Sequence, residues 1–367
     1  MRRITTTKCL SVKRKVAAAV LVLALGIGAF AAYELAGTTP TTYATEIAYT
    51  KTRPAFKVER RVAVTTAAQL RSAISDIRPG DLVTATSAFT VRGETIIDER
   101  LPARAEIDLT AGVEFVYDGR DNLPALWLAN AENLDIFGGD LSTSDRGGDC
   151  VRWTGSQHVL WWGFTLHDCG GTGLDVFTLK PGANGAGPVE GNDIQGEIWK
   201  TGQHRAWDPH AEKCTGLHGA NLADANYEPF EHNRIALDVH DTACSGAAIE
   251  FGSSRATHVP SHNTIILTAA DLSFVSKTQT GGNCFGTWGY GIRHTDIKYL
   301  QCDNAAGHPY WAHGMFQAAG GRALATDTVE FGRARDVRLN PRYASDADWD
   351  TTDGTVFQDV VPPGGAR

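Results

Sequence analysis

The chain has 367 residues, of which 42% are hydrophobic and 21% are charged, and its formal net charge is −8. This composition is typical of globular proteins and excludes both wholesale disorder and a collagen-like structure. The acidic charge argues against binding to nucleic acid, because proteins that bind it usually present a basic surface. The length fits one large domain or two smaller ones.

Residues 1–36 have the pattern of an export signal. The last basic group of this segment is Lys15, and an apolar and small-residue run follows at 16–32. A basic region, an apolar region and the small-x-small sequence at 29–31 are typical of a cleaved secretory signal. The apolar run is slightly shorter than the ~20 residues of a transmembrane helix, so a retained signal anchor is the alternative.

The rest of the chain is expected outside the cytoplasm in both cases, because the basic flank of such a segment stays inside. We therefore expect a protein that is secreted or anchored on the outer face of the cytoplasmic membrane. Residues 37–61 are rich in Thr and have no clear period, which predicts a tether. The folded domain is predicted at 62–345 and a C-terminal tail at 346–367. We expect a monomer that meets the membrane only through its N-terminal segment.

The folded domain is predicted to begin with an amphipathic helix at 65–80. Thr66 can cap this helix, and Pro79-Gly80 ends it. Its apolar face consists of Leu70, Ala73, Ile74 and Ile77. Short β-branched and aromatic runs follow, broken by Gly, Asn and Asp, which indicates many short strands.

The strand-like runs recur at intervals of 24 to 41 residues. Their apolar anchors are Val83, Ile107, Leu134, Val159, Ile194, Ile235, Ile265, Ile297 and Val329. Such spacing, with irregular insertions, predicts an all-β solenoid with loops on one side. A β-sandwich or a propeller is the alternative, but a propeller is more regular and a sandwich rarely has its one helix at the start.

One superfamily resembles this pattern specifically. The helix ending at Pro79-Gly80-Asp81, followed by DLVTATSAFTVRGETIID and AEIDLTAGVEF, resembles the N-terminal cap and first coils of the pectate-lyase-like right-handed parallel β-helix superfamily. The resemblance covers about 62–345. It implies a right-handed parallel β-helix (solenoid) with an N-terminal capping helix, and it implies side-chain ladders at one corner. The Asn-rich turns that fit such ladders contain Asn133, Asn192, Asn233 and Asn263.

The resemblance says less about chemistry. The superfamily contains polysaccharide lyases, glycoside hydrolases, epimerases, esterases and phage or adhesin β-helices. The paired Asp and Gly-His-Gly set of polygalacturonases is not found in this sequence.

Six cysteines remain once Cys9 is assigned to the export segment, and an even number in an exported chain predicts three disulfides. No two of the six have the close spacing of a CxxC zinc site. If the repeats stack, cysteines about one repeat apart lie above each other, within the Cα distance that a disulfide requires. The predicted pairs are Cys150–Cys169, Cys214–Cys244 and Cys284–Cys302.

Candidate site residues come from a second strand in each repeat. Six segments share small residues, then one apolar residue, then a variable residue. The variable residues are Arg152, Asp175, His218, Glu250, Gly286 and Gln317. Because side chains alternate along a strand and neighbouring strands lie ~4.8 Å apart, we expect an outward ladder. An ordinary polar exterior is the alternative, but an Arg, two carboxylates and a His in consecutive repeats favour a site.

A charged loop at 202–213 (GQHRAWDPHAEK) provides further candidates. Asp208, His210 and Glu212 could act as catalytic groups, with Trp207 and Lys213 as substrate contacts. The sequence Trp-Asp-Pro-His resembles the Asp-Pro-His loop of alginate C5-epimerases, in which Asp and His serve in proton abstraction. The Tyr-Gly-Phe before that motif is replaced here by 205–207, Arg-Ala-Trp. A surface loop without a role is the alternative.

These observations predict an exported enzyme that cleaves glycosidic bonds in a polysaccharide, a glycoside hydrolase. Asp175 and Glu250 would form the acid/base pair, and His218 would tune or relay the proton. The expected substrate contacts are Arg152, Trp207, Lys213, Trp288 and Gln317. A polysaccharide lyase or C5-epimerase is the first alternative, and a non-catalytic glycan-binding cell-envelope β-helix is the second.

No cofactor is expected. The one alternative is a calcium ion, which prefers oxygen ligands such as those of Asp140, Asp145 and Asp149.

Overall fold

The computed structural model describes residues 55–119, 121–144, 148–202, 207–208, 213–214, 218–222, 227–242, 247–253, 257–272, 282–289, 295–305, 310–313 and 332–335. The export segment, the tether up to residue 54 and the C-terminal tail therefore lie outside the described residues. Among the described helices, none has the length and apolar character needed to cross a membrane.

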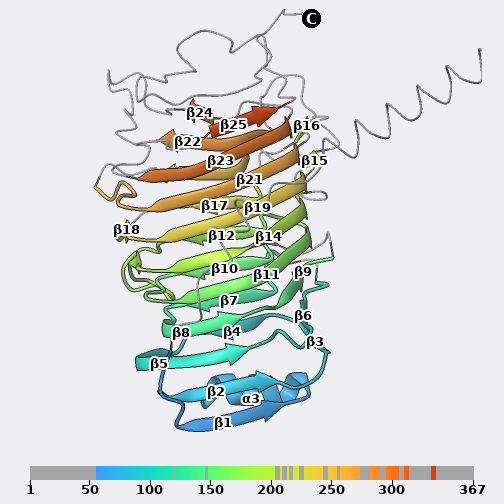
Figure 1. The fold of residues 1–367 in the computed structure, drawn as a ribbon, viewed down its shortest axis with the longest axis vertical. Coiled ribbons are helices and arrows are strands. Elements are labelled where there is room, and N and C mark those ends of the chain that lie inside the picture. The colour runs from blue at the N-terminus through green and yellow to red at the C-terminus, as the bar shows by residue number, and fades with distance from the viewer. Residues whose placement is uncertain are drawn as a thin grey trace, which may run out of the picture. The chain divides into compact units, whose positions relative to one another are not determined.

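The described part of the chain is mostly β, and nearly all of its strands pair in parallel (Figure 1). The larger sheet has thirteen strands. Its main path consists of β1 (Arg60–Val64), β2 (Asp81–Ala85), β5 (Arg100–Asp108), β8 (Glu132–Phe137), β11 (Leu160–Cys169), β14 (Asp193–Thr201), β19 (Arg234–Thr242), β21 (Thr264–Leu272), β23 (Asp296–Ala305) and β25 (Gly332–Arg335). Three short strands, β3 (Phe89–Arg92), β6 (Val113–Val116) and β9 (Asp140–Ser142), extend it beside β11.

The second sheet has eight parallel strands. They are β4 (Thr95–Ile97), β7 (Leu126–Ala129), β10 (Val151–Thr154), β12 (Leu174–Phe177), β17 (Ala220–Leu222), β20 (Ala247–Ser253), β22 (Asn283–Gly289) and β24 (Tyr310–His313). Two small sheets complete the set: β13 (Val189–Glu190) pairs with β18 (Phe230–Glu231), and β15 (Trp207–Asp208) pairs antiparallel with β16 (Lys213–Cys214).

In the two large sheets, strands pair with those that occupy the same place one repeat later, so the stacked order in Figure 1 follows the chain. This arrangement is compatible with a parallel β-solenoid. The predicted amphipathic helix is present as α3 (Ala67–Ser75), but it is shorter than predicted, because it ends at the C-cap Asp76 rather than at Pro79-Gly80. The Thr66 hydroxyl accepts a hydrogen bond from the Gln69 backbone N–H, as an N-cap does. Leu70, Ala73 and Ile74 are buried against the first strands.

The core is built from apolar columns, because each residue of a strand stacks on its counterpart in the next strand. The main column of the larger sheet consists of Val83, Ile107, Ile136, Trp161, Ile194, Ile235, Ile265 and Ile297. The predicted anchors Leu134 and Val159 were therefore wrong by two residues. A shift of two keeps a side chain on the same face of a strand, and both residues are still buried.

An asparagine ladder stabilises one corner of the repeats, as the resemblance implied. The Asn192 backbone and side-chain N–H groups donate to Asn233 Oδ1 at 3.1 and 2.9 Å, and the same groups of Asn233 donate to Asn263 Oδ1 at 3.0 Å. Asn133 is not part of this ladder. The register pairs Asp135 with Leu160 and Leu160 with Asp193, so Val159 is the residue one repeat before Asn192, and its backbone N–H donates to Asn192 Oδ1 at 3.0 Å. Asn133 belongs to the adjacent column, where the backbone turns.

That adjacent column has left-handed backbone in five consecutive repeats. Its residues are Asn133, His158, Gly191, His232 and His262, with φ between 53° and 67°. Gly and Asn reach this region at low cost. The two neighbouring histidines His232 and His262 stack their rings, with centroids 5.2 Å apart.

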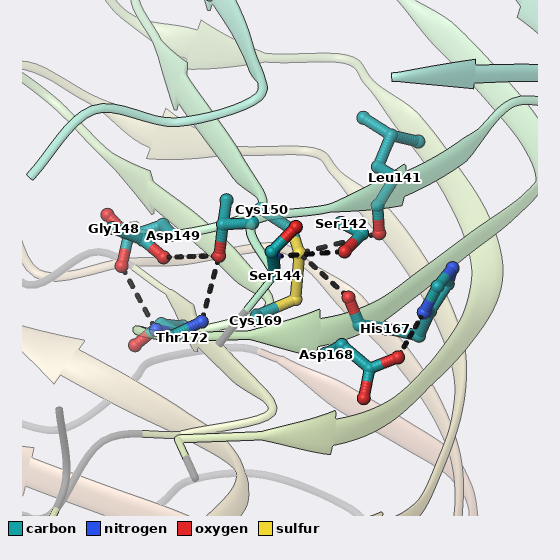
Figure 2. The surroundings of a disulfide bond; sticks show 12 residues. Leu141, Ser142, Ser144, Gly148, Asp149, Cys150, His167, Asp168, Cys169 and Thr172 are labelled. Atoms are coloured by element: carbon teal, nitrogen blue, oxygen red, sulfur yellow. Dashed lines mark hydrogen bonds and ion pairs between the residues drawn. A yellow bond between two sulfur atoms is a disulfide. The ribbon is translucent and has the colours of Figure 1, made fainter. Parts of the chain in front are cut away.

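The predicted disulfide between Cys150 and Cys169 is confirmed, with its two Cα atoms 5.3 Å apart. Cys284 is also disulfide-bonded. The side chains of Cys214, Cys244 and Cys302 are not among those described, so the pairs Cys214–Cys244 and Cys284–Cys302 stay predictions. The confirmed bond ties the residue before β10 to the last residue of β11, and so links the two sheets (Figure 2).

Candidate functional site

One column of side chains points out of the eight-stranded sheet. From Ile96 to Glu250 its members are half-buried or exposed, while the residues on either side of them in each strand are buried. Gly286, the next member, is buried. In register, the column consists of Ile96, Trp127, Arg152, Asp175, Asn221, Glu250, Gly286 and Trp311. The register thus places Arg152, Asp175, Glu250 and Gly286 in one column, as the sequence predicted.

Two predicted members of this column need correction. Asn221 stands between Asp175 and Glu250, where His218 was predicted. The position after Gly286 belongs to Trp311, and Gln317 lies outside the described residues. The error arose because Leu217-His218 repeats the apolar-then-polar pattern three residues before the strand itself, in which Ala220 is the buried residue.

His218 nevertheless contacts the column from the segment before β17. Its Nε2 forms a short contact with Glu250 Oε2, and the Ala247 backbone N–H donates to its Nδ1 at 3.2 Å. A ring nitrogen that accepts a hydrogen bond carries no proton, so this geometry assigns the ring proton to Nε2. Only 14% of the His218 side chain and 17% of the Glu250 side chain are exposed.

The other carboxylate is bound by the same segment. Asn221 Nδ2 donates to Asp175 Oδ1 at 3.0 Å. Residues 218–222 therefore supply one N–H donor to Asp175 on one side and one to Glu250 on the other. Sequence reasoning missed Asn221. The buried residue before it is the small Ala220, whereas the pattern used for the prediction looked for a large apolar residue at that position.

Arg152, next to Asp175 in the column, is fixed by a buried carboxylate. Its Nη2 lies 3.1 Å from Asp149 Oδ2. Asp149 Oδ1 also accepts the Thr172 backbone N–H at 3.0 Å, beside the disulfide shown in Figure 2. Burial raises the pKa of the Asp149 carboxyl above its usual range, and the nearby guanidinium opposes that effect. The arrangement holds the Arg152 side chain against the sheet at the start of β10.

The loop candidates are only partly described. The backbones of Trp207 and Asp208 pair with those of Cys214 and Lys213, which places Asp208 opposite Lys213 in a small hairpin. Trp288 lies in β22 and pairs with Gly252. The side chains of Trp207, Asp208, Lys213 and Trp288 are not described, and His210 and Glu212 lie outside the described residues. Their predicted roles stay predictions.

No metal-binding cluster of three or more His, Cys, Asp or Glu residues occurs in the part of the chain that the structure describes. Asp140 lies beside His167 and Asp149 beside Arg152, while Asp145 lies outside the described residues. A calcium ion held by these three residues stays a prediction.

The larger sheet carries a second charged cluster, centred on His167, that sequence reasoning did not identify. His167 Nε2 lies 2.8 Å from Asp140 Oδ1, and its Nδ1 lies 2.7 Å from Asp168 Oδ2. The imidazole stacks on Trp199, with centroids 4.7 Å apart. Alternation along β11 places His167 on the outer face, but no sequence pattern marks Asp140, which comes from the preceding repeat.

The two carboxylates hold His167 in its charged form. The hydrogen bond to Asp140, followed by that to Asp168, raises the pKa of His167 from 6.5 to about 9, although burial opposes this. The protonated ring should therefore stabilise the fold at neutral pH.

The contribution of His167 to stability should disappear at alkaline pH. Because the folded-state pKa lies above the unfolded value, about 3 kcal/mol is fully present below pH 6.5 and is lost as pH rises through about 9. The test is urea unfolding of the wild type and His167→Gln at pH 6 and pH 10. We expect a gap of this order at pH 6 and almost none at pH 10. An equal gap at both pH values would contradict the prediction.

Comparison with known proteins finds similarity in structure but not in sequence. No family model matches the chain, and no curated protein matches it significantly. An alginate lyase from Paenibacillus sp. strain FPU-7 superposes with a TM-score of 0.35 at 12% identity, over 77% of this chain and 96% of the lyase. The Dettilon tailspike protein superposes with a TM-score of 0.36 at 13% identity, over 74% of this chain and 59% of the tailspike chain. At these TM-scores neither similarity supports a functional argument.

Proposed function

We propose that this protein is an exported polysaccharide-active enzyme, specifically a glycoside hydrolase with Asp175 and Glu250 as its acid/base pair. The observation that supports the proposal is their register. The two carboxylates occupy the same outward column, two strands apart, with Asn221 between them.

The spacing suits hydrolysis with inversion. A separation of two strands places the backbones of Asp175 and Glu250 ~9.6 Å apart. Inverting glycosidases separate their carboxyl groups by ~6.5–9.5 Å, which leaves room for the sugar and an attacking water. One carboxyl gives a proton to the leaving glycosidic oxygen, and the other takes a proton from the water. Arg152, held by Asp149, would orient the sugar beside Asp175.

The proposal also includes the handedness of the fold and the location of the protein. Nearly every parallel crossover in known proteins is right-handed, which favours a right-handed β-helix with α3 as its N-terminal cap. The Cys150–Cys169 disulfide is typical of an oxidising compartment, which supports export. We propose that the enzyme acts there as a monomer.

The hairpin of β15 and β16 favours a second candidate, a polysaccharide lyase or C5-epimerase. Its register places Asp208 directly opposite Lys213. Removal of a proton from carbon creates an enolate-like charge, which a cation beside the base would stabilise. In this alternative the chemistry belongs to the loop, and the outward column binds the glycan.

A panel of neutral and uronate-containing polysaccharides tests the proposal. The purified full chain is incubated with each, and both new reducing ends and the absorbance of unsaturated uronates are measured. We expect reducing ends without unsaturated products. Unsaturated products would instead establish the lyase. Binding to a glycan with neither product would contradict both the hydrolase and the lyase. Proton NMR of the recovered glycan would then distinguish a C5-epimerase, which inverts uronate residues, from a non-catalytic glycan-binding protein, which leaves them unchanged.

A further inference from the structure

The two proposed catalytic carboxylates differ in the kind of donor that contacts them. Asp175 accepts an amide N–H of Asn221, while Glu250 is contacted by the Nε2 of an imidazole. Both donors come from residues 218–222, so one short segment contacts both members of the pair.

The imidazole is restricted on its other side. The Ala247 backbone N–H donates to His218 Nδ1, which removes that nitrogen as a site for a second proton. A ring that relays a proton must gain one at Nδ1 or pass one through it. Either event would break the bond to Ala247, at a position where only 14% of the His218 side chain reaches solvent.

We propose that His218 is a positioning residue: it stays neutral, donates Nε2–H to Glu250, and thereby holds Glu250 as the base of the pair. This inference rests on the proposed hydrolysis. Glu250 then takes a proton from the attacking water, whose oxygen bonds to the anomeric carbon. The bond from that carbon to the glycosidic oxygen breaks, and Asp175 gives its proton to the leaving oxygen. His218 neither gains nor loses a proton during these steps.

The inference separates two roles that the sequence left open for His218, tuning and relay. A side chain that only donates can be replaced by another neutral donor. Glutamine fits this role, because its Nε2–H₂ group reaches about as far as the imidazole Nε2 and cannot carry a proton away. Alanine removes the donor altogether.

Two variants and one matched control test the inference on the full chain. We expect His218→Ala to lower kcat by about 10-fold to 100-fold, the range for a lost hydrogen bond to a charged group, and to move the acidic limb of the pH profile upward. His218→Gln should recover most of this loss and restore the limb. His240→Gln is the control, because it changes another His–Glu contact, 2.7 Å long, on the larger sheet and should leave turnover unchanged. Equal losses in His218→Gln and His218→Ala would overturn the inference in favour of a relay.

A measurement that needs no turnover distinguishes failure of this inference from failure of the proposed function. Nitrogen NMR of the histidine rings reports which ring nitrogen carries the proton, and the His218 signals are those that disappear in His218→Gln. We expect an unprotonated Nδ1 and a protonated Nε2 at the pH of maximal turnover, or at neutral pH if no substrate is cleaved. An imidazolium at His218 would overturn the inference even in an active enzyme. A neutral Nε2–H ring in a protein that cleaves no glycan would leave the geometry correct and the proposed function wrong.

Discussion

Asp175→Asn and Glu250→Gln are each expected to lower turnover by about 10²-fold to 10⁴-fold while the fold stays intact. Each change keeps the size of the side chain and removes only its ability to exchange a proton. Asn221 and His218 would still contact the altered groups, so the local structure should persist. Turnover on the glycan identified by the panel is measured beside circular dichroism and thermal unfolding.

Three further variants decide where the chemistry lies. Glu197→Gln alters a carboxylate on the larger sheet, where it contacts His240, and should keep wild-type turnover. Asp208→Asn and His210→Ala alter the loop. If these loop variants abolish turnover while Asp175→Asn and Glu250→Gln remain active, the column is only a binding surface. The lyase or epimerase candidate would then replace the hydrolase.

Much of the fold could be predicted because it depends on patterns that repeat. Alternation within each strand-like run marks the buried face, and the single amphipathic period marks α3. The asparagine ladder was predictable for Asn192, Asn233 and Asn263, because each precedes a strand that begins one residue later. The pairing of Cys150 with Cys169 followed from a separation of about one repeat.

The candidate site was harder to predict, because it depends on the exact register between repeats of unequal length. Long insertions separate β12 from β17, and within them Leu217-His218 imitates the pattern of the strand that starts at Ala220. A shift of three residues changes which side chain points outward. The contact of His218 with Glu250 and that of His167 with Asp140 both join different repeats. No local sequence pattern encodes such contacts.

Asn233→Ala should destabilise the fold by about 2–5 kcal/mol, because it interrupts the middle of the asparagine ladder. Asn233 Oδ1 accepts two hydrogen bonds from Asn192, and Asn233 Nδ2 donates to Asn263 Oδ1 and to the Val189 carbonyl. The alanine variant leaves the Asn192 backbone N–H and the Val189 carbonyl without this partner in a buried corner. Each buried polar group left unpaired costs about 1–3 kcal/mol.

Urea unfolding followed by circular dichroism measures the change, with Asn184→Ala as the matched control. Asn184 is exposed, so the same chemical change there should alter the free energy of unfolding by less than about 0.5 kcal/mol. Equal unfolding midpoints for the two variants would contradict a structural role for the ladder. The location of Asn233 also predicts where the structure should loosen. Asn233 follows His232, whose backbone is left-handed with φ of 59°. Loss of the ladder removes the hydrogen bonds beside that turn, so the destabilisation should be accompanied by faster amide exchange at the start of β19.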